Sequence, residues 1–440
     1  MKPHRPALVA LSATCATLAM FALSACGDDP SSPEPADGGA DADAATDTPA
    51  TDAGDPTDSG AKPDVYADAP PRAIACSVDP CALELATAGS STCARLSDGT
   101  VKCWGGDDYG QLGRGPIDRS YDAVPTLVTG LAKVAHLSAG TDAYCATLED
   151  GSVKCWGKND SGELGFIDEG GATSSAVPVA VGGLPKVRAA FMGDGLACAA
   201  LESGDAMCWG RSSFGRIPSL ADAPAEPRPP TKVDLGGKIL TAIAPGKGAV
   251  VALAEDGTLL SWGKRSRPAL WELSTLGREA SVDPAVPAAL PAPARAGLLA
   301  GSSDTACAAS NGGALRWGGL QGATGAVSPT PVTFGTSAKV EWVSIAGGQF
   351  CAILDDDSAR CLGDNTFGQL GTGDYDPTIL IPVKVAEMPA KPARIVTSAY
   401  HACAILETGA VMCWGSNTRG LLGTGDYAIH IVPAAVRLSP

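Results

Sequence analysis

The stretch CARLSDGTVKCWG, residues 93–105, places two cysteines ten positions apart around an Asp-Gly turn and ends in Trp-Gly. Near-complete copies return as CATLEDGSVKCWG at 145–157, CAALESGDAMCWG at 198–210 and CAILETGAVMCWG at 403–415. Weaker copies are VALAEDGTLLSWG at 251–263, CAASNGGALRWGG at 307–319 and CAILDDDSARCLG at 351–363. The seven copies end at Trp104, Trp156, Trp209, Trp262, Trp317, Leu362 and Trp414, spaced by 52, 53, 53, 55, 45 and 52 residues. A period of this length indicates a repeat architecture rather than two independent domains.

Each repeat contains four short apolar segments separated by Gly, Asp and Pro clusters. In the second repeat these are 124–128, 134–138, 144–148 and 152–156. Short strands bounded by turn residues predict one antiparallel sheet per repeat. Seven such sheets arranged radially make a β-propeller, which protects its strand edges by closing into a ring. We therefore predict an all-β fold: a seven-bladed β-propeller of four-stranded antiparallel blades over residues 74–440.

The two ends of the repeat region suggest how the ring closes. Most repeats start with a strand that contains a Val-Pro pair, such as Val124-Pro125, but the first enters directly at residues 81–85. The chain finishes with a similar segment at 432–438 that has no successor. We predict that this C-terminal strand completes the first blade.

The paired cysteines fit a hairpin. A three-residue loop Ser97-Asp98-Gly99 with Gly99 in the left-handed conformation places Cys93 opposite Cys103, close enough for a disulfide. The same count predicts the pairs Cys145–Cys155, Cys198–Cys208, Cys351–Cys361 and Cys403–Cys413, with Cys76–Cys81 as a further short loop. The alternative is metal binding, but two thiolates supply only half a tetrahedral site and no second pair or histidine is nearby. Cys307 is unpaired, either a buried small residue or a reactive thiol.

The first 73 residues differ in composition from the rest. Lys2 and Arg5 precede an apolar run that ends in Leu-Ser-Ala-Cys at 23–26, the layout of a secretory signal. We predict a lipoprotein signal peptide at 1–25, with Cys26 lipidated. An ordinary signal peptide or a membrane helix is the alternative. Residues 26–73 then form a disordered acidic linker, because this Asp-, Pro-, Ala- and Gly-rich composition cannot bury enough apolar surface to offset chain entropy.

The charge of the chain divides unevenly. The formal net charge is −16, of which the linker carries −10, leaving 28 bases and 36 acids in the repeat region. A mildly acidic folded region argues against a nucleic-acid partner. Fifteen cysteines in an exported chain favour disulfides over reduced thiols. These features predict a location in the cell envelope, lipid-anchored to a bacterial membrane, with the outer membrane or cell surface favoured.

The repeat resembles the regulator-of-chromosome-condensation repeat, a seven-bladed propeller family. The resemblance covers about residues 83–440 and rests on Leu-Ser-Ala-Gly at 137–140, on the Trp-Gly ends and on the loops after them. Those loops read Gly-Gln-Leu-Gly at 110–113 and Asn-Thr-Phe-Gly-Gln-Leu-Gly at 365–371, with related sequences at 159–165 and 417–425. Repeats three to five depart from this loop sequence. The family name implies a nuclear exchange factor, but an exported, disulfide-bearing chain fits the secreted bacterial members, which resemble protein-binding modules.

The sequence offers little catalytic material. No serine elbow, phosphate loop, metal signature or nucleotide fingerprint is present, so we expect no cofactor and no metal. The resemblance implies a structural role for His401, and the tryptophans are expected to pack between blades rather than to bind sugars. The better ligand-binding candidates are aromatic residues in the loops after Trp-Gly, since loops often carry function and exposed aromatics act as anchors. They are Tyr109, Phe166, Phe214, Phe367, Tyr375 and Tyr427.

These observations predict an exported, membrane-anchored propeller that binds a protein or an envelope polymer through its inter-blade loops. An enzymatic role is less favoured, and the alternative is an extracellular hydrolase acting on envelope carbohydrate or peptide. A convergence of acids or histidines at one face of the ring would favour the hydrolase. A third option is a purely structural part of an envelope assembly.

Overall fold

The computed structural model describes residues 72–117, 120–166, 173–212, 215–218, 226–263, 287–290, 296–302, 305–310, 312–318 and 326–439. All of them belong to the compact unit Ala61–Pro440. The predicted signal peptide and Cys26 lie outside the described residues, as does the predicted linker up to residue 71. Within the described ranges, no helix is long and apolar enough to cross a membrane.

The described chain forms seven four-stranded antiparallel sheets, each made from four strands that are consecutive in sequence. Blade by blade, the strands are β1 Ala82–Thr87, β2 Ser91–Leu96, β3 Val101–Gly106 and β4 Tyr121–Leu127; β5 Val134–Ala139, β6 Ala143–Leu148, β7 Val153–Lys158 and β8 Ser174–Ala180; β9 Val187–Met192, β10 Leu196–Leu201, β11 Ala206–Arg211 and β12 Pro227–Val233; β13 Leu240–Pro245, β14 Val250–Ala254, β15 Leu259–Trp262 and β16 Ala288–Ala289; β17 Leu298–Ser302, β18 Thr305–Ser310, β19 Gly313–Gly318 and β20 Ala326–Val332; β21 Val340–Ala346, β22 Gln349–Leu354, β23 Ala359–Asp364 and β24 Thr378–Lys384; and β25 Pro392–Thr397, β26 His401–Leu406, β27 Val411–Gly415 and β28 His430–Ala435.

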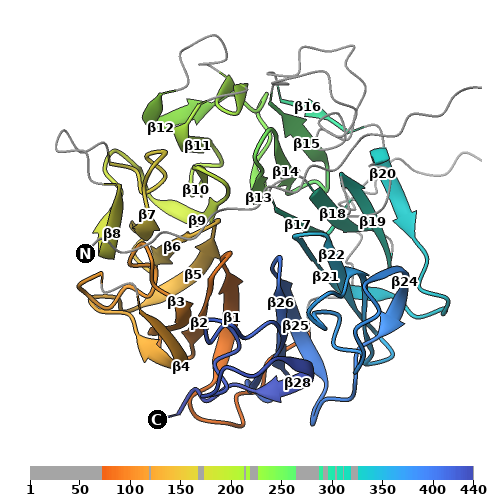
Figure 1. Cartoon of the computed structure of the whole chain (residues 1–440). Helices are drawn as coiled ribbons and strands as arrows, with labels where there is room; N and C mark the ends of the chain where they lie inside the picture. Colours follow the sequence, from red (N-terminus) through yellow and green to blue (C-terminus); the bar gives the residue numbers. More distant parts are fainter. Residues whose placement is uncertain are drawn as a thin grey trace, which may run out of the picture. The chain divides into compact units, whose positions relative to one another are not determined.

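The first strand of each blade lines the centre of a closed ring (Figure 1). Each of these inner strands contacts the inner strand of the next blade, from β1 through β5, β9, β13, β17 and β21 to β25, and β25 contacts β1. The hydrophobic core lies between neighbouring blades. One cluster, for example, joins Cys93 and Val101 of blade one to Leu137 and Trp156 of blade two. The predicted all-β, seven-bladed propeller of four-stranded antiparallel blades is confirmed.

The predicted closure by the C-terminal strand is wrong. β28 pairs with β27 and is the outer strand of blade seven, while blade one receives its outer strand, β4, from the segment that follows its own Trp-Gly. The Val-Pro segment thus forms the fourth strand of a blade, and not the first strand of the next one. Pairing with the strand just before it closes a shorter loop than pairing across the ring, and a shorter loop costs less chain entropy.

Blades seven and one are joined by packing and by an N-terminal segment instead. One core cluster combines Leu85 and Trp104 of blade one with Ile405 and Leu438 of the C-terminal region. Residues 72–82, which we call the strap, run along blade seven and hydrogen-bond to its hairpin turn at 407–409. The backbone bonds are Ala75 N to Glu407 O (2.7 Å), Ser77 N to Thr408 O (2.9 Å) and Ala82 N to Gly409 O (2.9 Å).

The outer strands carry prolines at irregular positions. In blade one the pairing shifts from Cys103–Thr126 to Gly105–Asp122, so Pro125 lies in a bulge opposite Trp104. The same shift occurs opposite the Trp or Leu position in blades two, three, five, six and seven. A proline or a bulge on an edge strand blocks pairing with another chain, so these edges are protected against aggregation.

Candidate binding face

The two ends of the ring differ in the loops they carry. The loop face bears the turns between the first and second strands of each blade and the long loops between the third and fourth strands. The turn face, at the opposite end, bears the hairpin turns such as 97–100 and the connections between blades. All six aromatic candidates belong to the long loops, so the loop face is the candidate binding face.

Most motif residues of the long loops hold neighbouring blades together. In blade six, Asn365 Oδ1 accepts from Leu370 N (3.0 Å) and Gln369 Oε1 accepts from Phe367 N (2.7 Å). Leu370 is fully buried, and the Gln369 carbonyl accepts from the indole of Trp414 in the next blade (2.9 Å). Four equivalent bonds run from Trp104 to Leu421, Trp156 to Gln111, Trp209 to Glu163 and Trp262 to Arg216, each at 2.9 Å. The loop sequence is therefore an inter-blade joint.

Blade three has the same joint although its long loop lacks the Gly-Gln-Leu-Gly sequence. Gly215-Arg216-Ile217 occupies the place of Gly-Gln-Leu, with Ile217 fully buried and the Arg216 carbonyl accepting from Trp262. The Arg216 guanidinium donates to the carbonyls of Asp194 (2.7 Å) and Gly246 (3.0 Å). Its burial lowers the pKa of Arg216 to about 10. The sequence comparison missed this loop because Arg replaces Gln and Pro218 replaces the closing Gly.

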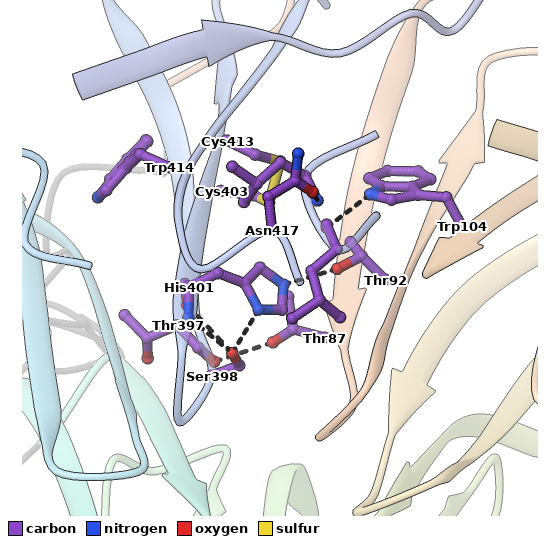
Figure 2. Close-up of a disulfide and its surroundings, with 12 residues drawn as sticks. Thr87, Thr92, Trp104, Thr397, Ser398, His401, Cys403, Cys413, Trp414 and Asn417 are labelled. Carbon is purple, nitrogen blue, oxygen red and sulfur yellow. Dashed lines mark hydrogen bonds between the residues drawn. A yellow bond between two sulfur atoms is a disulfide. The ribbon is translucent and has the colours of Figure 1, made fainter. Parts of the chain in front are cut away.

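His401 also links two neighbouring blades of the propeller. Its ring is completely buried between blades seven and one, with Nε2 2.8 Å from Thr92 Oγ1 and Nδ1 2.7 Å from Ser398 Oγ (Figure 2). A further bond between the two blades runs from Thr87 Oγ1 to the carbonyl of Thr397 (2.9 Å). Burial lowers the pKa of His401 to about 4, so the ring is neutral near pH 7. A neutral imidazole hydrogen-bonded on both sides has no free nitrogen for proton transfer.

The cysteines are used within blades. The structure joins Cys93–Cys103, Cys145–Cys155, Cys198–Cys208, Cys351–Cys361, Cys403–Cys413 and Cys76–Cys81. The first five pairs are cross-strand neighbours, as the hairpin count predicts. Cys307 is fully buried, and burial raises the pKa of its thiol, so it lacks the thiolate character of a reactive cysteine. Several disulfides in one chain indicate an oxidising, extracytoplasmic environment.

The channel at the centre of the loop face has no catalytic constellation among its described lining residues. It encloses about 380 Å³ and is lined by the ends of all seven inner strands, mainly by Ala, Gly, Ser and Thr. Asp194 is the one titratable side chain in that lining. Gly193 is required by close approach, because a Cβ there would lie 1.9 Å from the carbonyl oxygen of Pro245. Elsewhere in the described residues, no three His, Cys, Asp or Glu side chains are grouped as a metal site requires.

The six aromatic candidates divide by exposure. Phe166 packs against the core cluster between blades two and three. Tyr109 is half-buried with Lys158 Nζ 5.1 Å from its ring centre, and Phe367 packs edge-on against Tyr400 at 5.8 Å. Phe214 lies outside the described residues. Tyr375 and Tyr427 remain about half exposed, at 52% and 53%.

Sequence reasoning missed two exposed tyrosines of the loop face. Tyr121, 51% exposed, starts β4 and meets Tyr427 edge-to-face with ring centres 5.9 Å apart. Tyr400, 47% exposed, lies in the turn between β25 and β26. Neither residue belongs to the loop segments directly after Trp-Gly from which the aromatic candidates were predicted. Tyr121 directly precedes the apolar core of its strand, and that position would have identified it.

Comparisons with known proteins agree with this class of fold. Residues 98–146 match the Regulator of chromosome condensation (RCC1) repeat, and residues 134–163 and 393–421 match a second description of the same repeat. These segments therefore resemble RCC1 repeats, and the blades around them have the geometry of a seven-bladed β-propeller.

Relatives of known name share part of the chain. The chain is 27% identical to mouse Regulator of chromosome condensation over 354 residues, covering 74% of this chain and 82% of that protein. It is 26% identical to the ultraviolet-B receptor UVR8 of Arabidopsis thaliana over 288 residues, covering 62% of this chain and 63% of that protein. The 28% identical match to the human E3 ubiquitin-protein ligase HERC2 covers 74% of this chain and 7% of that protein. The matches thus span less than two thirds of UVR8 and of HERC2.

Solved structures share the fold. Yeast RCC1 (Prp20) bound to Kap60 superposes with a TM-score of 0.65 at 19% identity, covering 76% of this chain and 83% of that chain. Human WBSCR16 gives a TM-score of 0.63 at 19% identity, covering 73% and 85%. At these identities the likeness shows the fold alone.

Proposed function

We propose that this chain is an exported, lipid-anchored propeller that binds a protein or an envelope polymer through the loops of its loop face. The observation that carries the proposal is the exposure of Tyr375 and Tyr427. Neighbouring motif residues such as Asn365 and Leu370 are buried within the fold, whereas these two rings remain about half exposed. Exposed aromatic side chains on rigidly held loops are typical anchors of binding sites.

The position of the strap supports an anchor on the other side. Arg72, the first described residue, lies at the turn face, where its guanidinium pairs with Glu341 (2.9 Å) and its carbonyl accepts from Arg394 (2.9 Å). The chain therefore enters the propeller from the turn face. A tether that joins the described chain at Arg72 would thus be attached on the side opposite the loop face.

The relatives are consistent with a binding role. Two solved structures of one propeller, yeast Prp20, concern protein partners: in one Prp20 is bound to Kap60, and the other addresses its binding to Gsp1p and histones. We transfer from them only the general property of protein binding. Because the described channel lining contains Asp194 as its one titratable residue, no observation favours the hydrolase alternative.

Crosslinking in cells tests the proposal. The full chain is compared with a Cys26→Ser variant, with metabolic labelling by a fatty-acid analogue as the readout of lipidation. We expect the wild type to be labelled, to fractionate with membranes and to crosslink reproducibly to one partner. Membrane fractionation of the variant equal to that of the wild type would contradict the anchor. Turnover of an envelope polysaccharide by the purified chain would contradict the binding role.

A further inference from the structure

The tips of three consecutive long loops dock in the same way on the next blade. The equivalence is set by one backbone hydrogen bond that repeats around the ring. The bonds run from Gly373 N to Ile431 O (3.0 Å), Gly425 N to Ala123 O (2.8 Å) and Gly115 N to Ala176 O (3.1 Å). The residue two positions after each glycine is therefore presented in the same way by blades six, seven and one. Those residues are Tyr375, Tyr427 and Ile117.

These positions and the starts of the outer strands beside them carry exposed apolar side chains on blades six, seven and one. Tyr427 meets Tyr121 of blade one edge-to-face, and the strand register gives Ile429 of blade seven the place that Tyr121 has in blade one. By the repeat of this docking, Tyr375 and Ile429 hold the positions on blades six and seven that Tyr427 and Tyr121 hold on blades seven and one. We call Ile117, Tyr121, Tyr375, Tyr427 and Ile429 the rim patch. Their exposed fractions are 41%, 51%, 52%, 53% and 42%.

The rim patch is part of an uneven distribution of apolar surface. Among the described residues, 14 large apolar side chains are exposed, and 11 of them lie on blades six, seven and one. They include Ile381 and Val432, each directly before the proline of an outer strand, with exposed fractions of 72% and 42%. Single exposed apolar residues are ordinary, but a clustered patch marks a site of interaction.

The charge around the patch is negative. Asp374 and Asp376 flank Tyr375 and are exposed, and no described base forms an ion pair with either of them. Asp426 precedes Tyr427 and lies 3.2 Å from His430 Nε2, and the guanidinium of Arg437 lies beside Gly425. A surface of apolar side chains among carboxylates is complementary to a ligand that is apolar and cationic.

We propose that the rim patch binds an extended segment of a partner protein, in which apolar side chains lie between lysines or arginines. This inference rests on the proposed function. A protein is favoured over a polysaccharide because Ile117, Ile429 and Ile381 have neither the flat faces nor the polar groups that sugars need. Apolar side chains of a partner bury against isoleucine and valine without leaving hydroxyl groups unpaired. The lysines or arginines of the partner then meet Asp374 and Asp376, and with Tyr375 they form cation–π contacts.

Defined peptides and the purified full chain test this surface. The probes are fluorescent synthetic peptides: a Leu/Val core flanked by lysines, the same core flanked by glutamates, and a Ser/Gly core flanked by lysines. We expect only the first to bind, measured by fluorescence anisotropy. The variant Tyr121→Ala/Tyr427→Ala is expected to weaken binding by about tenfold or more, as removal of anchor residues does. Asp374→Asn/Asp376→Asn is expected to weaken binding and to reduce its dependence on salt.

The matched control is Val78→Ala/Ile239→Ala, which removes exposed apolar side chains away from the patch. It should bind like the wild type, and all variants are checked for an unchanged denaturation midpoint. Equal binding of the glutamate-flanked peptide, or unchanged binding by both patch variants, overturns the inference. Competition by purified envelope polysaccharide at the same patch overturns it in favour of a polymer.

Photo-crosslinking in cells separates this inference from the proposed function. A photoreactive residue is placed at Tyr427 in the patch or at Tyr109 elsewhere on the loop face. Crosslinks to one protein from Tyr427 support both statements. Crosslinks from Tyr109 alone leave the proposed function standing and refute the rim patch. Absence of crosslinks from both positions refutes both.

Discussion

Replacing His401 is expected to remove a large part of the pH dependence of stability. The ring is neutral in the folded state because burial between blades seven and one lowers its pKa to about 4, against 6.5 for an exposed histidine. As pH falls below about 6.5, His401 of the unfolded chain takes up a proton, whereas the buried His401 of the folded chain stays neutral until about pH 4. The free energy of unfolding therefore falls as pH falls from about 6.5 to about 4, and this contribution is fully retained above that window.

The size of the effect follows from the two pKa values. A difference of about 2.5 pKa units corresponds to about 3 kcal/mol, of which about 2 kcal/mol is lost between pH 7.5 and pH 5. His401→Gln removes the titration and keeps hydrogen-bonding groups. Blade six provides the precedent, since Gln349 faces Gly363 as His401 faces Gly415. At neutral pH the variant is expected to cost about 1–2 kcal/mol through altered hydrogen bonds.

Guanidinium denaturation followed by tryptophan fluorescence measures the effect, with the disulfides intact. The informative quantity is the difference between variant and wild type at each pH, because carboxylate titrations common to both cancel. We expect the stability advantage of the wild type to fall by about 2 kcal/mol between pH 7.5 and pH 5, so that it vanishes or reverses at pH 5. Parallel profiles for wild type and His401→Gln would show that the buried ring does not resist protonation.

Further predictions concern the ring itself. Gly193→Ala should destabilise the propeller by about 1–3 kcal/mol because its Cβ would overlap the carbonyl oxygen of Pro245, whereas Gly182→Ala, where no atom lies within 4 Å, should be near neutral in thermal denaturation. The double variant Cys403→Ser/Cys413→Ser should lose about 2–3 kcal/mol, since its disulfide closes a short loop, and non-reducing mass spectrometry of the wild type should find the pair oxidised. Arg216→Met should cost about 1–3 kcal/mol because it leaves buried carbonyls without donors; a midpoint equal to that of the wild type would argue against a stabilising role of the buried guanidinium.

The repeat pattern predicted the blades well because its signals are local. Two cysteines at equal distances from an Asp-Gly turn define a hairpin register, and Trp-Gly at a fixed position marks the strand whose tryptophan packs on the preceding blade. The order of strands within a blade is a different problem. The Val-Pro strand has the same composition whether it pairs with the strand before it or across the ring. That choice depends on loop entropy and on the bulge opposite Trp104, which hydrophobic alternation does not encode.

The candidate site was predicted less completely, since exposure depends on the neighbouring blade. Phe166 and Tyr427 both follow a Trp-Gly end, yet Phe166 packs against the core between blades two and three while Tyr427 remains exposed on Tyr121. The difference comes from residues far away in sequence. Likewise, Gly215-Arg216-Ile217 forms the same joint as Gly-Gln-Leu because the joint uses a backbone carbonyl, and a carbonyl is available from any residue type.

Each long loop has a part that supports the fold and a tip that is exposed. This explains why binding should be confined to blades six, seven and one. Up to the closing glycine, the side chains of a loop such as 365–371 satisfy backbone groups or support the next tryptophan, so substitution there costs stability. Asp374 still belongs to this structural part, since it accepts from Asn365 Nδ2 and Thr372 Oγ1, whereas Tyr375 and Asp376 follow it and are exposed. Residues can therefore be substituted for recognition without a large loss of stability only at the tips of the long loops. Blades six, seven and one combine intact joints with apolar tips, and this combination provides a rigid base and a variable surface for a partner.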